Sequence, residues 1–187
     1  LCTRSGSHPY NISLMSSLIA AIGPEKSEQW EKGVVANFAR APKGGDTDQI
    51  RAVAAGECDV TIGNTYYFAR LLKSNAPEDK AVVEKVGVIF PNQSGANGRG
   101  AHVNVSGAGI ARYAPNRENA AKFLEYLASE SAQRFFSDGN NEFPVVGKID
   151  NPALKQMGEF KRDPLSMDMV GKNYGAASQI FDRAGWK

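Results

Sequence analysis

Two adjacent tyrosines, Tyr66 and Tyr67, stand where a helix is predicted to begin. On a strand, neighbouring side chains would point to opposite faces. In the first turn of a helix they lie about 100° apart and can converge on one point. A phenolate is a hard oxygen donor that ionises at neutral pH only beside a strong positive charge. The pair could therefore bind a hard trivalent cation, although most such pairs divide between core and surface.

The stretch Ser5-Gly6-Ser7 lies between a predicted strand and the start of a predicted helix. Backbone N–H groups and the helix dipole favour an anion at such a place, and Gly6 lets the backbone come close. Capping of the helix explains the same residues equally simply. Tyr10, in the first turn of that helix, would lie near a bound anion and is a candidate third oxygen ligand.

Asp46 follows two glycines and precedes another predicted helix, so helix capping is its simplest role. If this helix start faces the same cleft, Asp46 or Thr47 could also bond the anion or a water on it. His8 and His102 share no zinc-ligand spacing. No phosphate-binding or dinucleotide-binding glycine motif occurs.

Hydrophobic spacing and turn residues predict an alternation of helices and short strands, which is typical of a parallel α/β sheet. In the second helix we expect a buried stripe of Trp30, Val34, Val35 and Phe38. The predicted helices are 9–23, 27–38, 44–56, 66–73, a long one at 116–136, and most of the tail 154–186. The predicted strands are 1–5, 58–62, 86–90, 102–111 and 142–146, with a polar link at 75–79.

Length and charge restrict the class of protein. The chain has 187 residues and a formal net charge of +2, and its cations are scattered, so we expect no nucleic-acid partner. No apolar run reaches the roughly 18 residues of a membrane span. The chain opens on Leu1-Cys2 as if within a strand, so we expect a processed chain or a fragment. Cys2 and Cys58 could form a disulfide or remain as buried thiols.

The sequence from 56 to 67, GECDVTIGNTYY, resembles the iron-site segment of bacterial ferric-iron-binding periplasmic proteins, the substrate-binding subunits of ABC iron importers. In that family a G-E-x-D, an apolar strand, an N-x-Y-Y and a helix occur in this order. Residues 3–7 resemble the anion turn of the family. The stretch 106–127 resembles a later strand and helix, and 182–187 resembles the C-terminal ending.

The resemblance implies an α/β fold of the type-2 periplasmic-binding-protein class, with two lobes joined by hinge strands and one lobe incomplete. Residues 1–85 and 144–187 would form the C-terminal lobe, and 86–143 the remaining part of the N-terminal lobe. The family begins with about a hundred further residues, which supply at least one more ligand and are absent from this sequence.

The resemblance also implies a site and a role. Ferric iron would be bound by Tyr10, Tyr66 and Tyr67. A synergistic anion, carbonate or phosphate, would be held by Ser5, Gly6, Ser7 and Asn64, with Asp46 where that subgroup has Asn. The protein would be a periplasmic monomer that delivers iron to an ABC transporter permease. An oxidising periplasm would favour a Cys2–Cys58 disulfide.

Two alternatives remain open. The protein could bind a phosphate-like, sulfonate-like or polyamine solute without metal, with the tyrosines stacking on an organic group. It could also be a hydrolase or transferase that uses Ser5 or Ser7 with His8. A serine enzyme needs an ordered base and an orienting acid, and no third partner can be named, so we expect no enzymatic activity.

Overall fold

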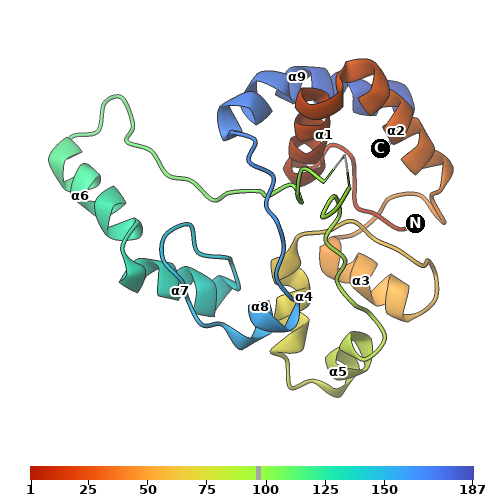
Figure 1. Ribbon diagram of the computed structural model, residues 1–187, viewed down its shortest axis with the longest axis horizontal. Coiled ribbons are helices and arrows are strands. Elements are labelled where there is room, and N and C mark those ends of the chain that lie inside the picture. The colour runs from red at the N-terminus through yellow and green to blue at the C-terminus, as the bar shows by residue number, and fades with distance from the viewer. Residues whose placement is uncertain (96–97) are drawn as a thin grey trace.

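The computed structural model describes residues 1–95 and 98–187, which form three groups of helices (Figure 1). Helices α1, α2 and α9 pack together, α3, α4, α5 and α8 form a second group, and α6 and α7 form an arm to one side. In this part of the chain no helix has the length and apolarity to cross a membrane. The helices are α1 (Pro9–Ile22), α2 (Pro24–Ala36), α3 (Asp46–Ala54), α4 (Thr65–Leu72), α5 (Pro77–Val83), α6 (Arg117–Leu127), α7 (Glu130–Asn140), α8 (Pro152–Gln156) and α9 (Met167–Ala184).

The first four predicted helices are confirmed, with ends that follow from their capping residues. Pro9 begins α1, where its missing N–H is not needed, and the His8 side chain accepts a hydrogen bond from the Tyr10 N–H. Gly23 ends α1 with a φ of 83°, a conformation that glycine adopts without steric cost. Asn64 precedes α4 with an extended backbone, so both tyrosine-bearing helices begin where expected.

Two predictions of the later part of the chain are wrong. The link at 75–79 gives way to α5, which Pro77 begins. The long helix at 116–136 is broken into α6 and α7 at Ser129, whose extended backbone and Oγ cap α7 by accepting from the Ala132 N–H. The hydrophobic spacing continues across the break, and the capping serine decides the outcome.

The predicted strands do not form a continuous sheet among the described residues. Two isolated parallel bridges are present, Cys2 with Thr61 and Ala101 with Arg162. The first joins the segments predicted at 1–5 and 58–62, so their parallel pairing is right although its length is not. A strand ladder needs a neighbour over several residues. Ile89 and Val105, in the predicted strands 86–90 and 102–111, are 88% and 51% exposed.

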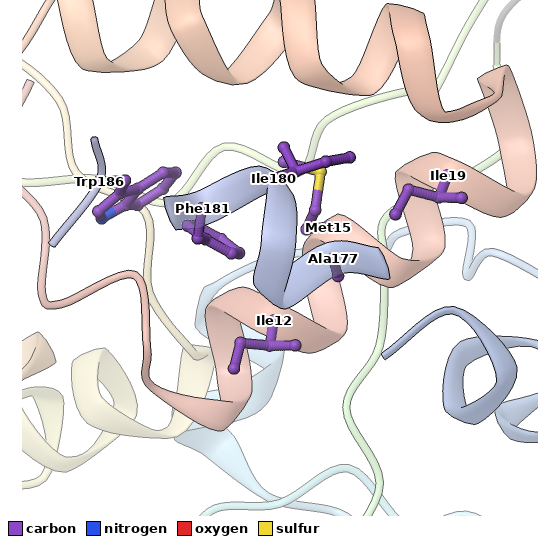
Figure 2. Packing of buried hydrophobic residues seen from close by; sticks show 7 residues of the cluster. All are labelled: Ile12, Met15, Ile19, Ala177, Ile180, Phe181 and Trp186. Atoms are coloured by element: carbon purple, nitrogen blue, oxygen red, sulfur yellow. The ribbon is translucent and has the colours of Figure 1, made fainter. Parts of the chain in front are cut away.

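One hydrophobic cluster joins α1 to α9 (Figure 2). Residues at helical spacing on α1 pack against a stripe on α9, and Trp186 packs at the end of the cluster. The Trp186 indole N–H donates to the Arg4 carbonyl at 3.0 Å. Gly6 has no room for a side chain, since a Cβ there would lie 2.3 Å from the Trp186 carbonyl oxygen. The buried members are Ile12, Met15, Ile19, Ala177, Ile180, Phe181 and Trp186.

A second cluster joins α4 to α3, α8 and the chain leading to residue 90. Phe68 and Leu71 of α4 are buried in this core. The first turn of α4 lies at the edge of the core. The disulfide predicted between Cys2 and Cys58 is present. It closes a loop with a sequence separation of 56, which in the chain-entropy model stabilises the fold by about 4 kcal/mol.

The expected stripe on α2 is wrong at one position. Trp30 is 36% exposed, and Glu31 is fully buried in its place. Among the described residues neither carboxylate oxygen of Glu31 has a hydrogen-bond partner. Burial first, and the charge of Glu28 second, raise the pKa of Glu31 to about 7, although the Arg183 guanidinium opposes them. Below about pH 7 the native state therefore favours Glu31 as a neutral acid.

We predict that Glu31 makes stability fall as pH rises. Between pH 4.5 and 7 the unfolded chain loses this proton first, so the free energy of unfolding should decrease by roughly 3 kcal/mol across that window. Glu31→Gln should remove this component and be more stable than the parent chain above pH 7. Chemical denaturation at several pH values measures it. The exposed Glu25→Gln on the same helix is the control, and an unchanged slope in Glu31→Gln would contradict the prediction.

Candidate metal centre

The structure brings two of the predicted tyrosine ligands into direct contact. Tyr10, from the first turn of α1, and Tyr66, from the first turn of α4, are hydrogen-bonded through their hydroxyls at 2.7 Å. They are 56 residues apart in the sequence. Two oxygens that bind one metal at about 2.1 Å and at right angles are about 3 Å apart. Only a small opening of this pair would admit a cation.

Tyr67 lies beside this pair. Its ring centroid is 4.3 Å from that of Tyr66, with an interplanar angle of 32°, as the helix-start prediction requires. The same side chain also packs against the second hydrophobic cluster. Three phenol side chains from two helix starts therefore gather at one place.

The surroundings of Tyr66 favour its neutral form. Burial raises the pKa of Tyr66 above its ordinary value, and the neighbouring Tyr10 and Tyr67 hydroxyls add to the increase, while Asn64 opposes it. The Arg70 guanidinium lies 5.9 Å and 5.5 Å from the Tyr66 and Tyr67 ring centroids. Ionisation of these phenols needs a positive charge closer than Arg70, such as a bound cation.

Asp46 is a buried carboxylate that connects two segments of the site. It is 1% exposed, and its Oδ1 pairs with Arg4 Nη1 at 3.1 Å. Its Oδ2 accepts from the Asn64 backbone N–H at 3.2 Å. One carboxylate therefore ties the turn before α1 to the residue that begins α4. Both carboxylate oxygens of Asp46 are used in this way, and the anion contact that we expected of Asp46 stays a prediction.

The Ser5-Gly6-Ser7 turn is held by its own side chains. The Ser5 and Ser7 hydroxyls are 2.8 Å apart, and the Asn11 amide donates to the Ser5 carbonyl at 2.9 Å. Gly6 is buried against Trp186, as described above, so packing accounts for the glycine. His8 Nδ1 accepts from the Tyr10 N–H at 3.3 Å, which uses that nitrogen for capping.

Sequence reasoning missed several residues that surround the phenols. Arg70 stands three and four residues after the tyrosine pair, which is helical spacing for one face and a signal that could have been used. Arg4 carries no such signal, because its partner Asp46 is 42 residues away. His102, which we expected to be unrelated to the site, lines the same cleft as Tyr10 and Tyr66.

Tyr10 and Tyr66 line a broad cleft. Its volume is about 1740 Å³, larger than the roughly 300–1,000 Å³ of a small-molecule pocket, and much of its wall is apolar chain from 86–90. Among the described residues no three His, Cys, Asp or Glu side chains gather to hold a metal. The oxygen atoms that converge at this place are the Tyr10 and Tyr66 hydroxyls.

Comparison with known proteins identifies the family to which the chain belongs. The profile of the family described as bacterial extracellular solute-binding protein matches residues 21–134. Iron uptake protein A1 of Synechocystis sp. is 51% identical over 185 residues, which cover 98% of this chain and 51% of that protein. The chain thus spans about half the length of the curated relatives that it matches.

Solved structures show the same likeness. Apo FutA2 from Synechocystis PCC6803 superposes with a TM-score of 0.95 at 49% identity, over 100% of this chain and 59% of that one. The Trichodesmium protein named IdiA or FutA, in complex with iron and citrate, superposes with a TM-score of 0.93 at 52% identity and the same coverage. The expected type-2 periplasmic-binding-protein fold is confirmed for the part that the chain spans. The chain belongs to the family of bacterial extracellular solute-binding proteins.

Proposed function

We propose that this protein binds ferric iron through the phenolates of Tyr10, Tyr66 and Tyr67 and delivers it, as a periplasmic monomer, to an ABC transporter permease. The observation that carries the proposal is the 2.7 Å contact between the Tyr10 and Tyr66 hydroxyls, with Tyr67 stacked alongside. Two similar proteins support it: one is named iron uptake protein A1, and the other was solved in complex with iron and citrate.

Binding requires the phenols to lose their protons. The hydrogen bond between Tyr10 and Tyr66 contains one of these protons, and two phenolates at that distance would repel one another without a cation between them. A trivalent cation supplies the compensating charge, and each phenolate then binds it as a hard oxygen donor. The affinity should accordingly fall as pH falls, because protons compete with iron for the same oxygens.

A synergistic anion, carbonate or phosphate, belongs to the same proposal. The Ser5 and Ser7 hydroxyls, which bond one another, can turn to an anion at the start of α1, where the helix dipole favours negative charge. Gly6 and Asn64 would complete the set. Asp46, which is paired with Arg4, would also bond the anion or a water on it.

The proposal also divides the chain into lobes. Residues 1–85 and 144–187 would form the lobe that presents the tyrosines, and 86–143 would belong to the other lobe. In Figure 1 helix α6 lies away from the two packed groups, which supports that division, whereas α7 is joined to the second group by the hydrogen bond from Asn151 Nδ2 to the Ser137 carbonyl. Closure of the lobes around iron would present the loaded form to the permease.

We predict that Tyr66→Phe combined with Tyr67→Phe removes most of the phenolate-to-iron colour, because Tyr10 alone remains as a phenolate ligand, and weakens ferric affinity by more than about 100-fold. Loss of groups that only support a ligand already weakens metal binding by about 10–100-fold. Visible absorbance and competition with citrate measure both quantities. Tyr113→Phe, at a tyrosine that is 85% exposed, is the matched control.

Unchanged iron affinity in the double variant would contradict the proposal. A parent chain that takes up citrate or phosphate in calorimetry but no iron would instead support a metal-free solute-binding protein.

We also predict that Asp46→Asn lowers the free energy of unfolding by about 2 kcal/mol, because it leaves Arg4 without its buried partner. Asp79→Asn removes one partner of the more exposed Arg51–Asp79 pair and should have a smaller effect. Urea denaturation of both variants measures the difference. An equal decrease in the free energy of unfolding in the two variants would contradict the prediction that the Arg4–Asp46 pair contributes more to stability than the Arg51–Asp79 pair.

A further inference from the structure

One extended segment touches both tyrosine-bearing helices. Its start is fixed at Ala101, which exchanges backbone hydrogen bonds with Lys161 and Asp163 at 2.9 Å each. Gly100 has a φ of 101°, and a Cβ there would lie 2.6 Å from the Arg162 carbonyl carbon, so the backbones approach closely. Figure 1 shows the chain leaving the centre of the molecule beyond this segment and running to α6.

Alternate side chains of this segment reach two different helices. In an extended chain residues two apart point to the same side, and His102 and Asn104 are such a pair. His102 Nε2 lies 3.0 Å from the Ser13 hydroxyl on α1. Asn104 Nδ2 donates to Asn64 Oδ1 at 3.1 Å, at the residue that begins α4.

Both contacts lie close to the phenols. Ser13 is one helical turn beyond Tyr10, and Asn64 is two residues before Tyr66. Together with the Tyr10–Tyr66 hydrogen bond, these contacts form a ring that joins the starts of α1 and α4. A rotation of either helix that separated the phenols would also stretch one of the contacts to the segment.

We propose that His102 and Asn104 are positioning residues that hold α1 and α4 so that the Tyr10 and Tyr66 oxygens stay at metal-binding distance. The inference rests on the proposed function, since it names residues that support the same site. It also means that residues 101–104 connect the chain toward α6 with the two tyrosine-bearing helices. A movement of the chain toward α6 is transmitted through this segment to both phenols.

The experiment compares His102→Leu, Asn104→Leu and the double variant with the parent chain. Each single variant should weaken ferric affinity about tenfold and the double variant up to about 100-fold, the range for groups that orient a metal ligand. The phenolate-to-iron absorption band should shift as well. His102→Gln keeps a side-chain amide near Ser13 and should restore most of the affinity. Ser106→Ala removes the hydrogen bond to Glu142 from the same segment and should change nothing.

Thermal unfolding and an iron-free measurement make the result decisive. Ultraviolet titration of the tyrosines should show the highest phenol pKa moving toward the ordinary value in the double variant, because the Tyr10–Tyr66 contact loosens. Variants that lose thermal stability but keep the parent affinity, band and titration would overturn the inference. If the parent chain binds no iron, the proposed function fails, and the titration alone still decides whether the segment positions the phenols.

Discussion

The hydrogen bond between the Tyr10 and Tyr66 hydroxyls joins two helix starts that are distant in the sequence, and the surrounding structure holds those two helix starts in place. The Cys2–Cys58 disulfide and the bridge beside it tie together the segments that lead into α1 and α4. The buried Arg4–Asp46 pair adds a charged link between the same segments. Packing of α1 on α9 and of α4 on α8 fixes each helix to its own core.

The surroundings of Tyr66 raise its pKa and so oppose its ionisation in the absence of a nearby cation. Burial and mutual hydrogen bonding favour the protonated form, and the guanidinium groups of Arg70 and Arg4 lie over the rings at more than 5 Å. Those positive charges moderate the repulsion between phenolates but would also repel a weakly charged metal. A cation of high charge gains the most from such a donor set, which favours a trivalent ion over a divalent one.

The sequence predicted the parts of the structure that local chemistry determines. Pro9 and Asn64 mark helix starts by their own conformational preferences, so the placement of the tyrosines could be foreseen. The exposed Trp30 and the buried Glu31 could not, because polarity predicts the reverse and the packing of α2 on α1 and α9 decides. The strand predictions placed 1–5 beside 58–62 correctly but overestimated the length of every strand, because pairing depends on neighbouring segments and not on the strand's own residues. The Arg4–Asp46 pair exists only after the chain has folded.

Resonance Raman spectroscopy of the ferric-loaded chain tests the central claim most directly. With excitation in the visible charge-transfer band, the account predicts strong tyrosine ring modes that shift when the protein is labelled with ring-deuterated tyrosine. It also predicts that these modes weaken in Tyr10→Phe and disappear in the variant lacking Tyr10, Tyr66 and Tyr67. Iron bound with no tyrosine modes in the spectrum would contradict phenolate ligation.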